Sequence, residues 1–182
     1  MTDEQVKNIM PKEDIRDKAK LKSIAKKILE DFDKEHKNSE FEYYDFMKIG
    51  EWVHKNIKYN LSYVDKTRLT ALDIYYKKKG VCHHYARLSN ALLYSLGYPV
   101  AYIGGYVFKN NKFDLDDGHA WSVIKLGNKW YPFDSCWGLF KGKVPITHIF
   151  SCLGEGYFAR YSYGYSARIS FDEEIFGQSM EE

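Results

Sequence analysis

Apolar residues recur at helical spacing in the first sixty residues of the chain. One stripe predicts an amphipathic helix from about residue 14 to residue 36 and consists of Leu21, Ile24, Ala25, Ile28, Leu29 and Phe32. A second helix is predicted to begin at Ser39, because Ser39 and Glu42 have the spacing of a capping box. Its apolar stripe is Phe46, Ile49, Val53 and Ile57. The opposite faces are polar, so both helices should pack on a core.

Two more helices are predicted in the next forty residues. A short one starts at Thr70, with Asp73 three residues on, and stops near Gly80 after a run of lysines. A longer one keeps the 3.6-residue period and ends at Gly97, two residues before a proline. This period places its first residue at about Cys82.

After residue 100 the pattern changes from helical spacing to strands. Residues 100–108 are rich in Val, Ile and Tyr, whereas residues 110–118 form a polar, Asp-rich stretch that predicts a loop. Strand candidates follow at 119–126 and 129–134, around a two-residue hairpin turn at 127–128. Helices followed by antiparallel strands define an α+β fold.

A chain of 182 residues predicts one compact domain. We divide it into an N-terminal helical segment, residues 1–38, and a core that carries the candidate chemistry, residues 39–140. Residues 141–182 form an aromatic- and Gly-rich C-terminal extension of the same domain, without a clear period.

The charge balance excludes several classes of partner. Lys and Arg number 27 against 25 Asp and Glu, so the net charge of +2 predicts neither a nucleic acid nor a membrane partner.

The N-terminus is acidic, with no signal-peptide pattern, and the longest apolar stretch is too short for a membrane span. The expectation is a soluble, cytoplasmic protein, although a secreted chain trimmed of its signal would look the same. Its 17% aromatic content indicates either half-exposed aromatic side chains around a groove or tyrosines that fill a sheet-rich core.

Three cysteines cannot all pair within one chain, and they are Cys82, Cys136 and Cys152. No CxxC motif occurs, so we expect neither a disulfide scaffold nor a zinc site. His83 and His84 are adjacent, but successive helical residues point about 100° apart, so they cannot both join Cys82 at one metal. We interpret both histidines as solvent-facing or groove-lining, and Cys136 as a small buried residue. No cofactor is expected.

Cys82, His119 and Asp134 carry the candidate chemistry. The N-terminus of a helix favours negative charge, which stabilises a thiolate at Cys82. A two-residue turn pairs Leu126 with Lys129, and this register puts His119 and Asp134 on one face as diagonal neighbours, about 7 Å apart. A three-residue loop would put Asp134 on the opposite face. The register therefore predicts a general base and the carboxylate that orients it, which together with a thiol make a nucleophile triad.

Four motifs in the same order carry a family resemblance. They are G-V-C-H-H-Y-A at 80–86, G-Y-P-V at 97–100, G-H-A-W at 118–121 and W-Y-P-F-D at 130–134. From Phe46 to Trp137 the chain resembles the core of the transglutaminase-like superfamily. The resemblance implies a papain-like catalytic core with Cys82 as nucleophile, His119 as general base and acid, and Asp134 as the residue that orients His119. It also makes Trp52 or Tyr59 a candidate donor to the oxyanion.

The resemblance further implies a minimal, microbial-type member of the family. The chain has no room for the β-domains of animal transglutaminases and lacks the CxxC zinc pair of the deglycosylating relatives. We expect an enzyme that attacks an amide of a peptide or protein and resolves the thioester mainly with water, as a peptidase or amidase. The alternatives are a protein-glutamine transglutaminase that transfers the acyl group to an amine and a non-catalytic binding module.

Overall fold

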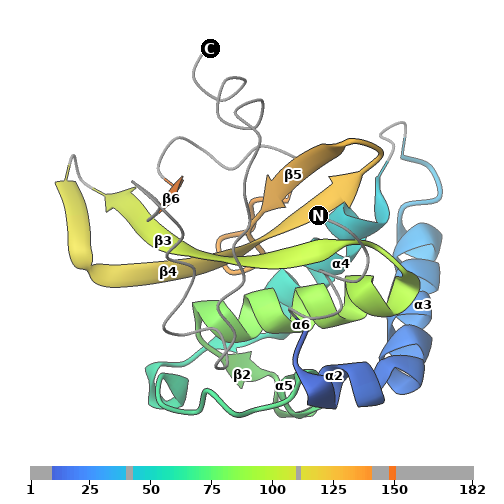
Figure 1. Ribbon diagram of the computed structural model, residues 1–182. Helices are drawn as coiled ribbons and strands as arrows, with labels where there is room; N and C mark the ends of the chain where they lie inside the picture. The colour runs from blue at the N-terminus through green and yellow to red at the C-terminus, as the bar shows by residue number, and fades with distance from the viewer. Residues whose placement is uncertain (1–9, 40–42, 110–111, 141–147, 151–182) are drawn as a thin grey trace.

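The structure, a computed structural model, describes residues 10–39, 43–109, 112–140 and 148–150 (Figure 1). Helices lie against one face of a four-stranded antiparallel sheet with the strand order β5-β4-β3-β6. The predicted α+β class is confirmed. Within the described residues, no helix has the length and apolar character needed to cross a membrane.

The first predicted helix is in fact two, α2 (Lys12–Arg16) and α3 (Lys18–Glu35), with Asp17 between them. The predicted apolar stripe of α3 faces the core, and Leu21 and Ala25 are almost fully buried. The prediction missed the break because the position of α2 depends on a distant contact. Asp14 is buried on α2 and bonds Arg87, 73 residues away.

Helix α4 (Asp45–Asn56) begins later than predicted. The proposed capping box at Ser39 is wrong, because the N–H of Ser39 donates to the carbonyl of His36 in the turn that ends α3. Glu42 lies outside the described residues. The apolar stripe of α4 is buried as expected and contains Phe46, Ile49 and Val53.

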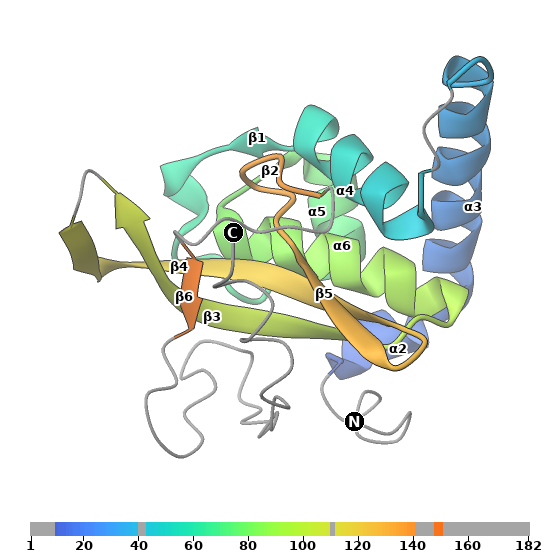
Figure 2. The same ribbon diagram turned by 90° about the horizontal axis from the view of Figure 1, so that it is seen from above.

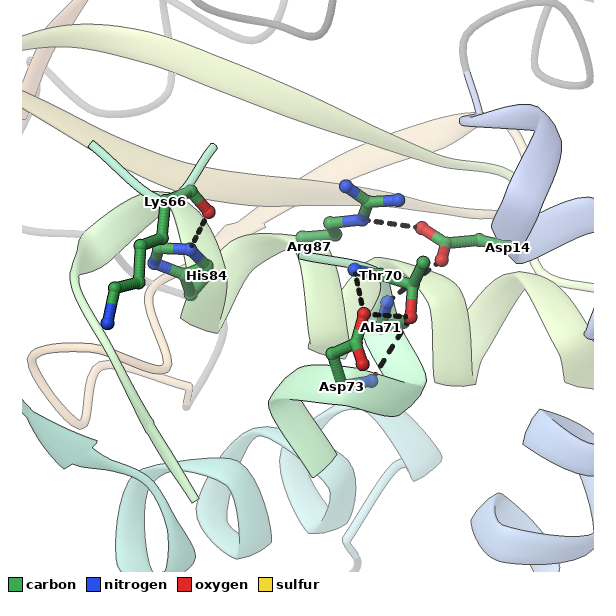
Figure 3. Close-up of polar contacts among 7 residues, drawn as sticks. All are labelled: Asp14, Lys66, Thr70, Ala71, Asp73, His84 and Arg87. Carbon is green, nitrogen blue, oxygen red and sulfur yellow. Dashed lines mark hydrogen bonds and ion pairs between the residues drawn. The ribbon is translucent and has the colours of Figure 1, made fainter. Parts of the chain in front are cut away.

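The capping box at Thr70 is confirmed at the start of α5 (Ala71–Lys77). The Thr70 hydroxyl accepts from the N–H of Asp73 (3.1 Å), and the Asp73 carboxylate accepts from the N–H of Thr70 (3.0 Å; Figure 3). The helix ends at Lys77, earlier than predicted, because Lys78 takes the left-handed conformation with φ 54°.

A two-stranded parallel sheet follows that the sequence did not predict. It pairs β1 (Lys58–Tyr59) with β2 (Lys79–Gly80). Each strand has only two residues, so no alternation of polar and apolar positions could reveal it. Between them lies a short 3₁₀ turn, η1 (Leu61–Tyr63), which precedes α5.

Helix α6 (Cys82–Leu96) has the predicted bounds and is the central helix of the fold (Figure 1). Gly97 ends it at φ 104°, a left-handed conformation that favours glycine. Leu88, Leu92 and Leu93 are fully buried and share one core cluster with residues of α3, α4 and the sheet. This packing fixes the position of Cys82 at the first residue of the helix.

The sheet consists of β3 (Val100–Lys109), β4 (Lys112–Leu126), β5 (Lys129–Phe133) and β6 (His148–Phe150). The β4–β5 hairpin has the predicted register, with Leu126 opposite Lys129.

The predicted polar loop at 110–118 is wrong over most of its length. Strand β4 begins at Lys112 and pairs with β3, because backbone pairing between two strands does not require apolar side chains. The irregularity of the β3–β4 ladder lies between Tyr106 and Phe108. Most of the C-terminal extension, including Cys152, lies outside the described residues.

Candidate active site

Cys82, His119 and Asp134 come together in space from three separate elements. Cys82 starts α6, His119 lies on β4, and Asp134 follows β5 directly. The Nε2 atom of His119 lies 2.6 Å from Oδ2 of Asp134, and the imidazole also forms a side-chain hydrogen bond with Cys82. His119 and Asp134 are buried, at 7% and 1% exposure. Since Asp134 occupies Nε2, the nitrogen left for the sulfur is Nδ1.

The turn after β5 fixes the carboxylate of Asp134. Its Oδ1 accepts hydrogen bonds from the N–H groups of Cys136 (2.8 Å) and Trp137 (3.2 Å), which leaves Oδ2 to His119. The backbone of Asp134 also pairs with Leu139, which closes the turn. Both oxygens are therefore held, and the imidazole has one preferred orientation.

Helix α4 supports the same turn from outside the triad. In Figure 2 the turn that follows β5 lies beside α4, where Nδ1 of His54 donates to the carbonyl of Ser135 (3.0 Å). The hydroxyls of Ser135 and Ser89 also meet at 2.6 Å and tie the turn to α6. No local pattern could predict these contacts, because each joins residues more than 40 positions apart.

His84 holds the segment that carries Cys82. Its Nδ1 accepts from the N–H of Val81 (3.1 Å), and its Nε2 donates to the carbonyl of Lys66 (3.0 Å; Figure 3). Gly80 is required here, because a Cβ at this position would lie 2.5 Å from Cβ of His84. The interpretation of His84 as solvent-facing or groove-lining is wrong, since its side chain is fully buried. The sequence signal was the position of His84 as the third residue of the helix, from which a side chain can bond the N–H of the N-cap residue, as in a capping box.

The pKa of His119 is shifted in the opposite direction from the pKa values of His83 and His84. Burial by itself would lower the pKa of His119, but hydrogen bonds to Asp134 and Cys82 outweigh it and raise the pKa to about 9. Burial, followed by the charges of His84 and Arg87, lowers the pKa of His83 to about 4. Burial also lowers the pKa of His84. At neutral pH His119 is therefore an imidazolium, whereas the two histidines beside Cys82 are neutral.

Aromatic rings surround the imidazole. The ring of Trp137 lies 4.8 Å from that of His119, and buried Trp121 stacks at 6.0 Å. These rings displace water around the hydrogen bond to Asp134, and a hydrogen bond is stronger in such surroundings. Cys136 packs against the core cluster but is half-buried, so it is less buried than we expected.

The two candidate oxyanion donors lie in different surroundings. Trp52 stacks on Tyr75, and the ammonium of Lys78 lies 4.0 Å from both rings, so Trp52 joins α4 to α5. Tyr59 lies opposite Gly80 in the parallel pair and is 54% exposed. Of the two, Tyr59 belongs to the strand beside the segment that carries Cys82.

Within the described part of the chain, no three His, Cys, Asp or Glu residues are grouped so as to hold a metal ion. The fold is of the mixed class in which a helix that begins with a thiol packs on an antiparallel sheet that carries an imidazole. The family model of the transglutaminase-like superfamily matches residues 22–135, more than half of the chain. The protein belongs to the transglutaminase-like superfamily, as the resemblance implied.

Three solved structures are similar to the chain. A provisionally named cysteine protease from Cytophaga hutchinsonii is 26% identical, with a TM-score of 0.56 over 76% of this chain and 44% of that chain. A protein named only as a TGase is 15% identical, with a TM-score of 0.49 over 95% of this chain and 48% of that chain. The periplasmic domain of TgpA from Pseudomonas aeruginosa, bound to ethylmercury, is 18% identical, with a TM-score of 0.44 over 67% of this chain and 45% of that chain.

The chain spans less than half the length of each of these three proteins. No curated protein matches it significantly.

Proposed function

We propose that the protein is a thiol-dependent acyl-transfer enzyme that attacks an amide of a peptide or protein and releases the acyl group mainly to water. The observation that carries the proposal is the hydrogen-bonded series Cys82–His119–Asp134, which joins a thiol to an imidazole and the imidazole to a fixed carboxylate. Membership of the transglutaminase-like superfamily and the 26% identity to a provisionally named cysteine protease support the same reaction class.

In the first step, the sulfur of Cys82 attacks the carbonyl carbon of the amide, with its proton held by His119. The N–H groups of His84 and Tyr85 already bond the carbonyl of Val81, so the N–H groups at the very start of α6 are placed to stabilise the oxyanion. His119 then gives its proton to the leaving nitrogen as the C–N bond breaks. The products are a thioester on Cys82 and a free amine.

In the second step, the neutral imidazole of His119 takes a proton from water while the water oxygen attacks the thioester carbonyl. The C–S bond breaks, the acyl group leaves as a carboxylic acid, and the imidazolium and the sulfur anion are restored. Asp134 stays ionised and holds His119 in the orientation that serves both steps.

The test of the nucleophile is chemical labelling. With iodoacetamide at pH 7, Cys82 should be alkylated much faster than Cys136 or Cys152, measured by mass spectrometry of the digested protein. Hydrolysis of peptide amides should be abolished in Cys82→Ala and should persist in the matched control Cys136→Ala. Equal labelling of the three cysteines, or full turnover by Cys82→Ala, would contradict the proposal.

The fate of the thioester is tested by competition. A glutamine peptide is offered together with an excess of a primary amine, and the acid and the amine adduct are both quantified. We expect the acid to dominate. A predominant amine adduct at millimolar amine would instead identify a transglutaminase.

A further inference from the structure

Exposed apolar side chains gather in one short stretch of the chain. The large hydrophobic side chains that are exposed in the described residues include Tyr59 at 54%, Leu61 at 71% and Val64 at 49%. The remaining two, Tyr44 and Tyr76, lie elsewhere in the chain. Isolated exposed hydrophobics are ordinary, but three within six residues single out this stretch as a candidate contact surface. We call Tyr59, Leu61 and Val64 the apolar loop surface.

Hydrogen bonds anchor both ends of this loop beside the nucleophile. At one end Tyr59 pairs with Gly80, and the N–H of Asn60 donates to the carbonyl of Gly80 (2.8 Å). At the other end the carbonyl of Lys66 accepts from His84 (Figure 3). Gly80 and His84 each lie two residues from Cys82 along the chain, so both ends of the loop are bonded to the segment that carries the thiol.

The loop is also ordered before any substrate arrives. The side chain of Asn60 accepts from the N–H of Ser62 (2.9 Å), and the carbonyl of Asn60 accepts from the N–H of Tyr63 (3.0 Å). The ring of Tyr63 packs edge-on against His84. A surface held in this way loses little conformational entropy on binding, which favours recognition.

The exposed charges in the same stretch of the chain are mostly positive. Exposed cations within residues 58–68 and at the following strand are Lys58, Lys66, Arg68 and Lys79. Asp65 is the acidic residue in the same stretches. This local excess contrasts with the near-neutral chain, and it favours a ligand that carries a carboxylate.

We propose that Tyr59, Leu61 and Val64 select the acyl donor by binding a peptide segment in which an apolar side chain stands beside a carboxylate, close to the amide that Cys82 attacks. This inference rests on the proposed function and names its substrate class. The apolar side chain contacts the loop, and the surrounding lysines and arginine attract the carboxylate.

The test separates binding from turnover by using the full-length Cys82→Ala protein. Two fluorescein-labelled peptides share a central glutamine, and one carries Leu-Asp beside it where the other carries Ser-Asn. Fluorescence anisotropy should show tighter binding of the Leu-Asp peptide, weakened by added salt. Adding Leu61→Gln should weaken that binding about five-fold or more, whereas adding Tyr76→Gln, at another exposed residue on α5, should not change it.

Equal affinity for the two peptides, no detectable binding of either, or no effect of Leu61→Gln would overturn the inference. The same peptides are then given to the protein with Cys82 intact. Selective binding without turnover would refute the proposed function but would support the apolar loop surface as a binding site. Turnover of both peptides with the same KM would refute the role of the apolar loop surface in substrate selection but would support the proposed function.

Discussion

The carboxylate of Asp134 shows how much a single residue contributes to the candidate site. It is buried, it accepts two backbone N–H groups on one oxygen, and it bonds His119 through the other. A carboxylate held in this way stabilises the imidazolium beside it. The pKa of His119, about 9, is the result of this arrangement together with the bond to Cys82.

The pH dependence of turnover should follow His119. Protonation of the leaving amine needs the imidazolium, so kcat/KM should fall as the pH rises through about 9. Asp134→Asn removes the negative charge, so the pKa of His119 should drop and the alkaline limb should move to lower pH. The rate itself should fall roughly 10²- to 10⁴-fold, with residual activity. The pH profile of kcat/KM measures both effects.

The matched control for this change is Asp31→Asn, which removes an exposed carboxylate on α3. Its profile should coincide with that of the unmodified protein. An alkaline limb that does not move in Asp134→Asn would mean that the carboxylate does not set the proton affinity of His119.

The same bonds make the stability of the fold depend on pH. The pKa of His119 in the folded state lies above its ordinary value of 6.5, so protonation favours the folded state. This contribution is complete below pH 6.5 and is lost as the pH rises through about 9. We expect the difference in free energy of unfolding between pH 6 and pH 10 to shrink in His119→Gln, measured by urea denaturation.

At the scale of elements, the start of α6 depends on a contact between a glycine and a buried histidine. Gly80 ends β2, and His84 lies in the first turn of α6 with both ring nitrogens bonded. His84 has no space to move away, because it is fully buried and its ring lies 3.9 Å from that of His83. The glycine therefore sets where the helix begins and where its first residue, Cys82, is held.

Gly80→Ala should displace the start of α6. The added Cβ would lie 2.5 Å from His84, and overpacking of this kind costs about 1–3 kcal/mol in free energy of unfolding. Urea denaturation measures the loss, and the rate of Cys82 alkylation should fall with it. The control is Gly104→Ala, where the nearest atom, Cε1 of Tyr102, lies 3.9 Å from the new Cβ. If the two variants are equally stable, the close packing of Gly80 on His84 is not a constraint.

At the scale of the whole molecule, the N-terminal helices share one core with the rest of the chain. Leu21, Ala25 and Ile28 of α3 lie in the same hydrophobic cluster as the sheet residues Ile124 and Phe133. A buried ion pair adds a polar connection. Asp14 of α2 bonds Arg87 of α6 (2.7 Å) and accepts from the N–H of Ala71 at the start of α5 (2.9 Å; Figure 3).

Asp14→Ala should destabilise the whole fold. It leaves the guanidinium of Arg87 buried without its carboxylate and the N–H of Ala71 without its acceptor. Loss of one partner of a buried pair costs about 3–5 kcal/mol, measured as the free energy of unfolding in urea. The neighbouring Glu13→Ala, at an exposed position, should change it by less than about 0.5 kcal/mol. Similar stabilities of the two variants would show that the pair is not needed.

The sequence by itself determined the features that depend on neighbouring residues. The 3.6-residue period and a terminal glycine located α6 and placed its first residue at about Cys82, and the two-residue turn set the β4–β5 register. Only the tertiary structure decided the contacts between distant residues: the Asp14–Arg87 pair, the bond from His84 to Lys66 and the parallel pairing of β1 with β2. The physical reason is that helical period and turn geometry act over a few positions, whereas these contacts join residues 18 to 73 positions apart and form only when the core closes around them.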